Sequence, residues 1–505
     1  MRKIVYCLQF TVYSLQLVVY CFLFSACTET VSDARQETGQ PRIYPDYLGV
    51  TIPMNIAPLN FSMADEKALC IDAVISDSHG NSLHSQGEEV VDFDIDEWHA
   101  LLAHNSGDSL SVTVSARYED GWHTWRPFSI YVSPDSIDYG ICYRLIEPGY
   151  EVWSKMGIYE RDLSSFEERA LIENTQFEGC VNCHSFNRGN SADMSLHIRG
   201  PHGATLLRHN DGPIVAYNTK TDQTLGLCVY PYWHSSGRFV AYSTNTTRQL
   251  FHSAGRNRVE VFDEASDLQV YDVEKNELLL SPLLKQDSVF ETYPVFSADG
   301  RSLYFCAARS SSQIDSIRYN LCRIDFDPET GSFGNRIDTI VDASAQHKSV
   351  SFPRPSYDGR FLCYTLSDYG QFSIWHHEAD LWMLDLRSEK REVISDRSAA
   401  ARPMAAANSE DTESFHNWST NSRWLVLSSR RDDGLYTRPY FCHVDTDGNV
   451  TKAFMLPQRN PRRFYRDRFF SFNVPDFVIG PTRFDGREAS RIINDEYRKN
   501  FGVRK

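Results

Sequence analysis

A hairpin pattern that occurs four times constrains the fold of this 505-residue chain more than any other feature. Each copy begins with an aromatic residue and an apolar strand, continues through a turn that resembles Ser-x-Asp-Gly-Arg, and ends in a second apolar strand. The aromatic residues are Tyr230, Tyr293, Phe352 and Phe415, so neighbouring copies begin 63, 59 and 63 residues apart. A period this regular predicts an array of similar structural units.

Further apolar strands follow the hairpins at a matching offset, over residues 267–272, 320–325, 380–385 and 440–445. A hairpin with two further strands forms one blade of a β-propeller, in which radial repetition buries faces that a single blade would expose. Residues 199–221 and 469–480 can supply an early and a late blade. The chain is therefore predicted to be all-β, with a propeller of six blades and a seventh left open.

The hairpins resemble the blades of TolB-type propellers, whose repeat reads Pro-x-Trp-Ser-Pro-Asp-Gly-Lys. Ala298 and Tyr357 stand where that repeat has its second Pro, and the last copy lacks the Asp-Gly pair. The resemblance implies a TolB-like propeller over residues 200–485, followed by a C-terminal tail over residues 486–505. Because the repeats bury their own faces, this propeller is expected to fold without the residues that precede it.

A second pattern precedes the repeats. Cys180, Cys183 and His184 form Cys-x-x-Cys-His, the attachment signature of a c-type haem. In that chemistry both thiols add to the haem vinyl groups, and the histidine becomes the proximal iron ligand. With 12 Cys and 16 His in the chain, roughly 0.01 such patterns are expected by chance. The sequence predicts covalent haem c, and leaves open a surface disulfide, a redox dithiol or a partial zinc site.

The haem is expected in a short helical or irregular segment over residues 136–199. A capping box predicts a helix over residues 164–174 that leads into the haem signature. His197 is the first candidate for the distal iron ligand, and Met194 is the alternative. If residues 194–198 are extended, these two side chains face opposite sides and only one of them can reach the iron.

The N-terminus resembles a bacterial lipoprotein signal peptide, expected over residues 1–27. An apolar run over residues 4–24 follows two basic residues, and small residues stand before Cys27. Cleavage there would leave Cys27 as a lipidated N-terminus with a polar tether over residues 28–42. An uncleaved transmembrane anchor is the alternative, because the run is long enough to span a bilayer. We expect a cell-envelope lipoprotein in the outer membrane that faces the periplasm, with surface exposure left open.

Residues 43–135 are predicted to form a small immunoglobulin-like β-sandwich, with one short helix over residues 96–104. Seven cysteines lie outside the signal peptide, the lipidation site and the haem signature. Because seven is an odd number, at least one of these cysteines is unpaired. A chain of this length can also fold without disulfide cross-links. We therefore expect most of these cysteines in the cores of strands rather than in a disulfide framework.

The composition and the missing motifs limit the function. A formal charge of −16 argues against an electrostatic grip on nucleic acid. The nucleophile elbow of hydrolases, a phosphate-binding glycine loop and the His-Glu-x-x-His pattern are absent from the sequence. Whether the chain is an enzyme is left open, and a non-catalytic role is favoured.

The whole layout resembles exported Bacteroidetes propeller lipoproteins that are often labelled as cytochrome c biosynthesis proteins. The resemblance implies an envelope-anchored monohaem protein for electron transfer or redox sensing, whose propeller docks a protein partner. Two alternatives remain: a propeller that acts as a binding module without haem, and a haem enzyme that uses a propeller pocket.

Overall fold

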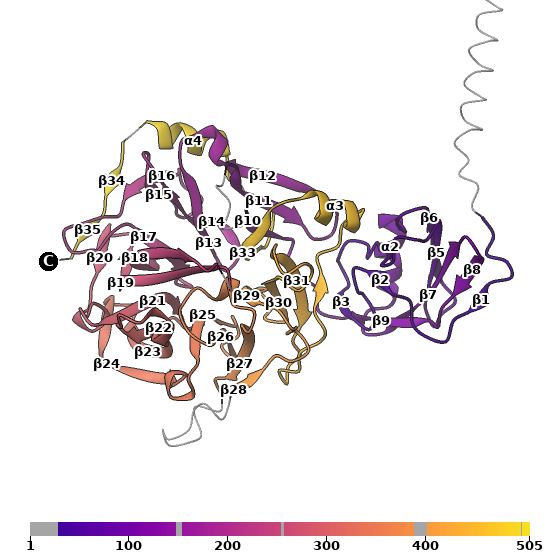
Figure 1. The fold of residues 1–505 in the computed structure, drawn as a ribbon. Coiled ribbons are helices and arrows are strands. Elements are labelled where there is room, and N and C mark those ends of the chain that lie inside the picture. Colours follow the sequence, from indigo (N-terminus) through magenta and orange to yellow (C-terminus); the bar gives the residue numbers. More distant parts are fainter. Residues whose placement is uncertain (1–28, 148–153, 254–256, 388–400, 496, 505) are drawn as a thin grey trace, which may run out of the picture.

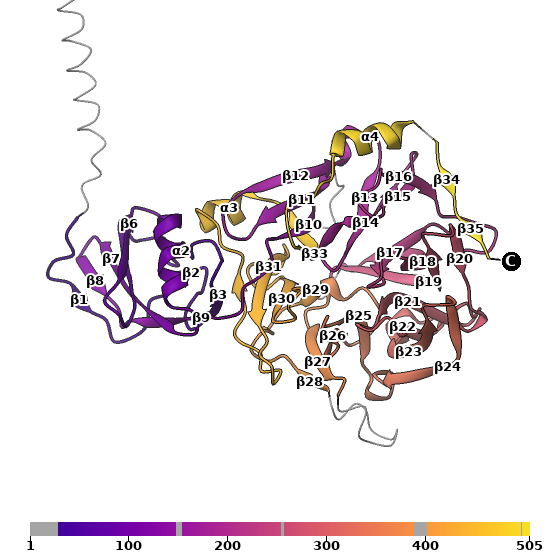
Figure 2. The same ribbon diagram turned by 180° about the vertical axis from the view of Figure 1, so that it is seen from behind.

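The computed structural model describes residues 29–147, 154–253, 257–387, 401–495 and 497–504. These residues form a small N-terminal β domain and a large ring of β-sheets that lie side by side (Figures 1 and 2). The signal peptide predicted over residues 1–27, including Cys27, lies outside the described residues. Within the described ranges, no helix has both the length and the apolar character needed to cross a bilayer.

Most strands of the N-terminal domain belong to one large sheet. Its seven strands are β1 (Arg35–Gln36), β3 (Thr51–Pro53), β5 (Cys70–Ser76), β6 (Ser82–Gly87), β7 (Ser109–Tyr118), β8 (Gly121–Thr124) and β9 (Phe128–Ser133). A second sheet has only two strands, β2 (Ile43–Tyr44) and β4 (Ser62–Met63).

The helix α2 (Ile95–His104) completes this domain and confirms the helix predicted over residues 96–104. Its N-cap Asp94 accepts hydrogen bonds from the first turn, and Trp98 lies in the same hydrophobic core as the strands. For residues 43–135, a helix and a strand pair therefore stand where an immunoglobulin-like sandwich would have a second large sheet. The apolar face of α2 supplies the cover that the first sheet needs.

Part of the tether predicted over residues 28–42 belongs to the N-terminal domain. β1 pairs in parallel with β8, which places Arg35 beside His123. The Glu37 carboxylate lies 2.8 Å from His123 Nδ1. Residues 35–37 are thus part of the folded sheet and not a free linker, because backbone pairing and this contact fix them.

Six sheets surround a central axis and form six blades, which confirms the predicted six-bladed propeller. Blade one contains β33 (Ser471–Val478), β10 (Gly140–Ile146), β11 (Met156–Asp162) and β12 (Glu168–Glu173). Blade two contains β13 (Cys180–Asn187), β14 (Asn190–Arg199), β15 (Ala204–Arg208) and β16 (Val215–Asn218). Blade three contains β17 (Cys228–Trp233), β18 (Phe239–Phe251), β19 (Val259–Asp272) and β20 (Glu277–Leu279).

The other three blades follow in chain order. Blade four contains β21 (Val289–Phe296), β22 (Ser302–Arg309), β23 (Asn320–Asp327) and β24 (Ser332–Val341). Blade five contains β25 (Ser349–Pro355), β26 (Phe361–Ser367), β27 (Asp380–Asp385) and β28 (Ala401–Pro403). Blade six contains β29 (Glu413–Trp418), β30 (Trp424–Ser429), β31 (Arg438–His443) and β32 (Phe454–Met455).

Blade one closes the ring with strands from both ends of the propeller sequence. Its inner strand β33 follows blade six, and it pairs antiparallel with β10, which precedes blade two. Gly140 lies opposite Val478, and Ile146 lies opposite Ser471. The propeller therefore begins at residue 140 and not at residue 200.

The prediction of a helical or irregular segment over residues 136–199 is wrong, because the described residues of this range form the strands β10 to β14. The predicted helix over residues 164–174 is a turn followed by β12. Ser164 donates hydrogen bonds to the Asp162 side chain from its backbone and its hydroxyl, both at 2.8 Å. Such local bonds favour a turn over a helix, so the capping-box pattern was misleading here.

The C-terminal tail predicted over residues 486–505 is also part of the propeller. The helix α4 (Gly486–Asn494) buries Ala489 and Ile493 in the core between blades one and two. β34 (Lys499–Asn500) adds to blade two, and β35 (Gly502–Val503) adds to blade three. The tail thus joins three neighbouring blades. A further helix, α3 (Pro461–Asp467), precedes β33.

The repeated turn has a clear physical basis. In blade four, the Ser297 hydroxyl donates to Asp299 at 2.6 Å, and Asp299 accepts from the Arg301 backbone at 3.1 Å. Gly300 has φ +71°, and a Cβ there would meet the His234 ring. In the degenerate copy, Ser422 takes the equivalent backbone conformation with φ +59°. The hairpin is therefore retained where the Asp-Gly pair is lost.

One hairpin extends well beyond the others and reaches across two blades. We call residues 245–253 and 257–266, the outer part of β18 and β19, the arm. Tyr319 of blade four donates its hydroxyl to Asp263 of the arm at 2.9 Å. Tyr369 and His376 of blade five contact Glu260 at 2.6 and 3.1 Å, which fixes the arm over that edge of the ring.

The N-terminal domain packs against blade six, and the two share a hydrophobic core (Figure 1). Asp135 lies 2.8 Å from His443 and Asp138 accepts from the Thr420 hydroxyl at 2.6 Å. These contacts join the two domains into one continuous body at this edge.

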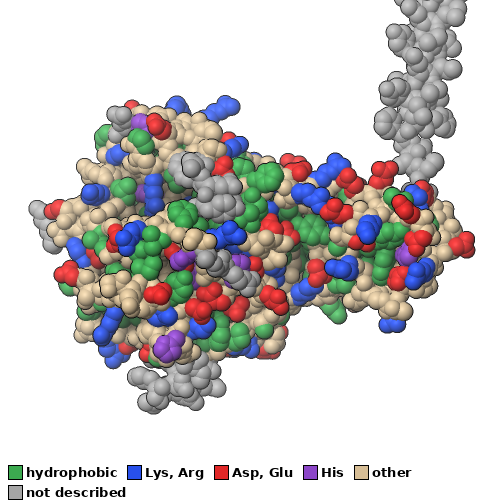
Figure 3. All heavy atoms as spheres, in the orientation of Figure 1, with side chains coloured by type: hydrophobic (Ala, Val, Ile, Leu, Met, Phe, Trp, Pro, Cys, Tyr) green, Lys and Arg blue, Asp and Glu red, His purple; other side chains and the backbone are tan. Residues whose placement is uncertain are grey.

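On the face shown in Figure 3, acidic side chains lie among basic ones over both domains.

Candidate functional site

The inner strands of all six blades share a backbone distortion. Each contains a β-bulge with one residue in the left-handed region, which is costly for residues other than glycine and persists only where the fold enforces it. We call these the anchor residues. They are Cys183 (φ +31°), Tyr230 (+51°), Tyr293 (+53°), Phe352 (+51°), Phe415 (+35°) and Val474 (+51°).

The haem signature lies on an ordinary blade strand, β13, with Cys183 as its anchor residue. The segment Cys183-His184-Ser185-Phe186 is the equivalent of Phe415-His416-Asn417-Trp418 in blade six. The sequence predicted an early blade over residues 199–221 but missed its inner strand β13, because a cysteine replaces the aromatic anchor. The shared pattern of a histidine followed two residues later by an aromatic side chain could have revealed it.

Four aromatic anchors pack against one another around the propeller axis. Their ring centroids are 4.6 Å apart for Tyr230 and Tyr293, 4.3 Å for Tyr293 and Phe352, and 4.6 Å for Phe352 and Phe415. Contacts of this kind each contribute about 0.5–1.5 kcal/mol beyond the area that they bury. These edge-on and tilted ring contacts fix the inner strands of blades three to six against each other at the axis.

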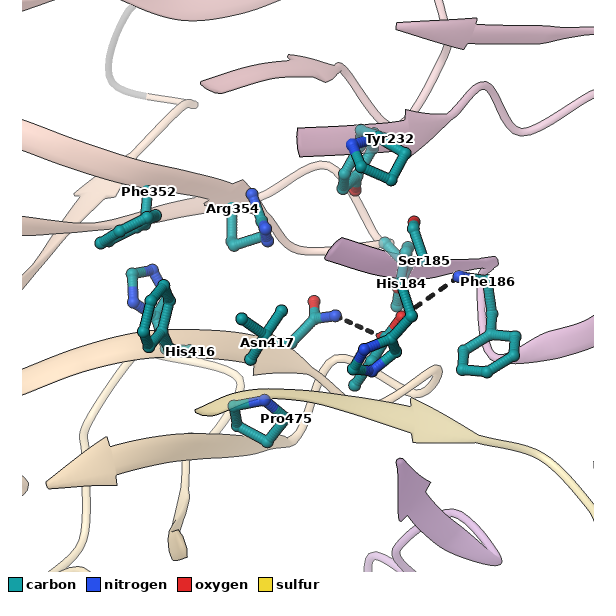
Figure 4. A pocket seen from close by; sticks show the side chains of 14 residues that line it. His184, Ser185, Phe186, Tyr232, Phe352, Arg354, His416, Asn417 and Pro475 are labelled. Carbon is teal, nitrogen blue, oxygen red and sulfur yellow. Dashed lines mark hydrogen bonds between the residues drawn. The ribbon is translucent and has the colours of Figure 1, made fainter. Parts of the chain in front are cut away.

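A cavity of about 30 Å³ lies at the axis next to these rings (Figure 4). Its wall is formed by the inner strands of five blades and one residue beyond them. The lining residues are His184, Ser185, Phe186, Pro231, Tyr232, Phe352, Arg354, Tyr357, Phe415, His416, Asn417, Val474, Pro475 and Asp476. A space of this volume holds about two water molecules or a group of similar size.

Asp476 is the buried acid of this axial cavity. It accepts a hydrogen bond from the Asn417 amide at 2.5 Å and one from the Phe186 backbone at 3.2 Å (Figure 4). Burial raises the pKa of Asp476 to about 7, and the hydrogen bonds and the Arg354 charge only partly oppose this. The Arg354 guanidinium lies 5.6 Å from the Tyr232 ring. The cavity wall thus combines a cation with an acid that titrates near neutrality.

Two neutral imidazoles complete the polar lining of the cavity. Burial lowers the pKa of His184 to about 4 and the pKa of His416 to about 3. Neither ring has a nitrogen with a hydrogen bond of ordinary geometry to a described residue. Buried polar groups in native proteins are usually satisfied by the protein, by water or by a ligand. These two rings leave hydrogen-bonding capacity at the cavity.

The surroundings of His184 do not fit a haem. His184 is 5 % exposed, and the adjoining cavity of about 30 Å³ is far smaller than the roughly 300–1,000 Å³ typical of small-molecule pockets. Both Cys180 and Cys183 are free thiols, and only Cys180 is partly exposed. Burial raises the pKa of the Cys180 thiol, although Arg144 and Arg199 oppose this effect. In this arrangement no iron can reach His184.

Neither candidate for the distal iron ligand, His197 or Met194, is placed to share an iron with His184. Leu196 lies directly opposite His184 on β14, so those two side chains share a face of the sheet. His197 follows Leu196 and therefore faces the other side, where its Nδ1 lies 3.2 Å from the Thr205 hydroxyl. Burial lowers the pKa of His197 to about 3. Met194 shares the face of Leu196, but it is packed in the apolar core.

The described residues contain no cluster of three or more His, Cys, Asp or Glu side chains arranged to hold a metal ion. All nine cysteines in the described ranges are free thiols, and eight are buried, as expected for core residues. The polar groups that line the axial cavity include one guanidinium, one titratable acid, one amide, two neutral imidazoles and the hydroxyls of Ser185, Tyr232 and Tyr357.

No known family model matches this chain. No curated protein matches it either. Among solved structures, a DUF4784 family protein from Bacteroides caccae is similar with a TM-score of 0.28 and 8% identity, over 68% of this chain and 93% of that one. Porphyromonas gingivalis dipeptidyl peptidase 4 is similar with a TM-score of 0.30 and 12% identity, over 68% and 51% of the two chains.

Prolyl oligopeptidase B from Galerina marginata is similar with a TM-score of 0.36 and 10% identity. That match covers 68% of this chain and 42% of the oligopeptidase, so this chain spans less than half of the larger protein. At identities this low, the similarities concern the fold alone.

Proposed function

We propose that this protein is an exported, lipid-anchored β-propeller that binds a ligand at its axial cavity and does not transform it. The observation that carries the proposal is the pair of buried imidazoles, His184 and His416, which have no hydrogen bond of ordinary geometry to a described residue and line the axial cavity together with Arg354 and Asp476. The anchor would be lipid on Cys27, which would hold the chain at the cell envelope, in the outer membrane on its periplasmic side.

The cavity suits a carboxylate group, either of a small molecule or at the tip of a partner protein's side chain. A guanidinium attracts carboxylates and donates to them with charge-assisted hydrogen bonds. Because its pKa is about 7, Asp476 is protonated in mildly acidic solution and can then donate a hydrogen bond to the same group. When ionised, Asp476 would repel a carboxylate, so binding should strengthen as pH falls through 7.

Formate is the smallest probe of this site. We expect its affinity for the wild-type protein to be about tenfold higher at pH 5.5 than at pH 8, since most Asp476 side chains are protonated only at the lower pH. Asp476→Asn should remove this pH dependence, and Arg354→Ala should weaken binding about tenfold or more. Titration calorimetry measures each affinity. Equal formate binding by Arg354→Ala and by Arg387→Ala, a surface arginine of the same blade, would place binding elsewhere.

A second candidate is the haem-bearing form, in which an envelope-anchored monohaem protein transfers electrons or senses redox state and docks a protein partner through its propeller. The observation in its favour is the signature itself, with Cys180 and Cys183 both free and Cys180 partly exposed between Arg144 and Arg199. The folded blade leaves no space for a haem at His184, so a haem-bearing form would need a different arrangement of blade two.

Mass spectrometry of the protein exported by a host that makes c-type cytochromes tests the anchor and the haem together. We expect lipid on Cys27 of the wild-type chain, and Cys27→Ala should be found in the soluble fraction without lipid. A haem peptide around Cys180 and Cys183 that persists after denaturation, and disappears when both become Ser, would support the second candidate. Cys70→Ser is the matched control. If the wild-type chain carries no haem peptide, the second candidate is wrong and the binding module is the remaining proposal.

A further inference from the structure

An open groove on blade four lies away from the axial cavity and has its own polar lining. It has a volume of about 530 Å³, which falls within the range of sites for small organic ligands. It is formed where the ends of β21, β22 and β23 meet two loops at the edge of the blade. The lining residues are Val289, Ala307, Ala308, Arg309, Ser316, Arg318, Asn320, Cys322, Ser344 and His347.

Two guanidinium groups at this groove lack acidic partners among the described residues. Neither Arg309 nor Arg318 forms an ion pair with a residue in the described ranges. Arg318 donates to the backbone carbonyls of Asp315 and Ile317, and its Nε has no hydrogen-bond partner in the part of the chain described. In a chain with a formal charge of −16, two uncompensated cations beside one groove indicate an anionic ligand.

The remaining lining adds hydrogen-bonding groups beside a small apolar strip. Ser316, Asn320 and Ser344 present hydroxyl and amide groups, whereas Val289, Ala307 and Ala308 present only hydrocarbon. This combination suits a sugar ring, which has hydroxyl groups at its edge and C–H groups on its face.

A buried acid lies next to the groove on the same face of the sheet. Glu291 is fully buried, and neither of its carboxyl oxygens has a hydrogen-bond partner among the described residues. It pairs directly across the strands with Ala307, a lining residue, so both side chains point to the same side. Burial raises the pKa of Glu291 to about 9, with a further contribution from Asp267. Glu291 is not itself a lining residue, so this neutral carboxyl group lies behind the wall of the groove.

We propose that this groove binds a sugar acid of the uronate type. The carboxylate is held by Arg309 and Arg318, the hydroxyls by Ser316, Asn320 and Ser344, and the apolar ring face by the alanines. This site is independent of the axial cavity, so the two can succeed or fail separately.

Titration calorimetry with glucuronate as the probe and glucose as its neutral counterpart tests the proposal. We expect wild-type protein to bind glucuronate more tightly than glucose, and Arg309→Ala and Arg318→Ala to weaken glucuronate binding about tenfold or more each. Arg301→Ala, which removes an exposed arginine at the other end of the same blade, should leave the affinity unchanged. Arg354→Ala should also leave it unchanged, which separates this groove from the axial cavity.

Three results would overturn the proposal: no binding of glucuronate, equal affinity for glucuronate and glucose, or equal losses in Arg318→Ala and Arg301→Ala. Inorganic phosphate is a further probe. If phosphate displaces glucuronate when both are present at equal concentration, the groove recognises negative charge alone and the assignment to sugar acids is wrong. Circular dichroism of each variant confirms that the exposed substitutions leave the fold intact.

Discussion

A fragment that begins at Gly200 should fail to form a closed propeller, although it contains all four hairpin repeats from which the propeller was predicted. The fragment lacks β10, β11 and β12 of blade one and β13 and β14 of blade two. β33 then loses its pairing partner, and the core that includes Val181, Leu196 and Ile198 is removed. The loss exceeds the roughly 5–15 kcal/mol by which a typical domain is stable, so no cooperative melting is expected.

Calorimetry and far-ultraviolet circular dichroism of two fragments provide the comparison. The control begins at residue 136 and retains all six blades, and it should melt cooperatively. Its stability is expected to be lower than that of the full chain, because removal of the N-terminal domain exposes the core that this domain shares with blade six. Cooperative melting of the fragment that begins at Gly200, near the temperature of the control, would show that blade one is dispensable.

Replacement of His376 by Gln should destabilise the protein by about 3 kcal/mol near pH 6, because it leaves two carboxylates without the cation between them. His376 is fully buried, with Nε2 at 3.1 Å from Glu260 and Nδ1 at 3.1 Å from Glu378. The Glu378 side chain is 30% exposed, which keeps the expected loss at the lower end for buried ion pairs. The effect should concentrate on the arm, since Glu260 belongs to it.

The same histidine predicts a pH dependence with a definite sign. Burial alone lowers the pKa of His376, but Glu260 and Glu378 outweigh it and raise the pKa to about 9. A raised histidine pKa contributes stability that is complete below the unfolded value of about 6.5 and is lost as pH rises towards 9. His376 lowers the pKa of Glu378 to about 2 against the effect of burial, so that contribution is lost below about pH 4.5.

Urea unfolding of the wild type and of His376→Gln at pH 6 and pH 9 measures both effects. The wild type should lose stability between these pH values, and His376→Gln should lose less, because it lacks the titrating group. His79→Gln, at an exposed histidine of the N-terminal domain, is the control. If His376→Gln retains the full pH dependence of the wild type, the histidine is not charged in the folded protein.

The hairpin repeat located four of the six predicted blades because a local signal specified each of them. A turn such as Ser297 to Arg301 satisfies its own hydrogen bonds, so it forms wherever its residues occur. Blades one and two lack that signal at the anchor positions, where Val474 and Cys183 replace an aromatic residue. The pairing of β33 with β10 joins strands more than 300 residues apart, and local patterns carry no information about such a partner.

The axial cavity could be predicted only in part. His184 was expected to be a functional residue on chemical grounds, and the structure does place it at the axis beside the cavity. Arg354, His416 and Asp476 were not expected, because they meet only after three separate inner strands are arranged around one axis. The interpretation of residues 164–174 as a helix failed for the opposite reason: a local hydrogen-bonding pattern fits both a helix start and a tight turn.

The pairing of β10 with β33 also sets the order in which this protein can be completed. β10 can pair with β11 early in synthesis, yet its other partner, β33, is made near the end of the chain, so one edge of β10 stays unpaired through most of translation. Exposed strands of this kind are templates for association with other chains. The growing chain therefore carries its main aggregation hazard at its first propeller strand. A truncated chain that ends before residue 471 lacks β33 and keeps this edge of β10 exposed. Completion of β33 is therefore the step of synthesis that removes the main risk of aggregation.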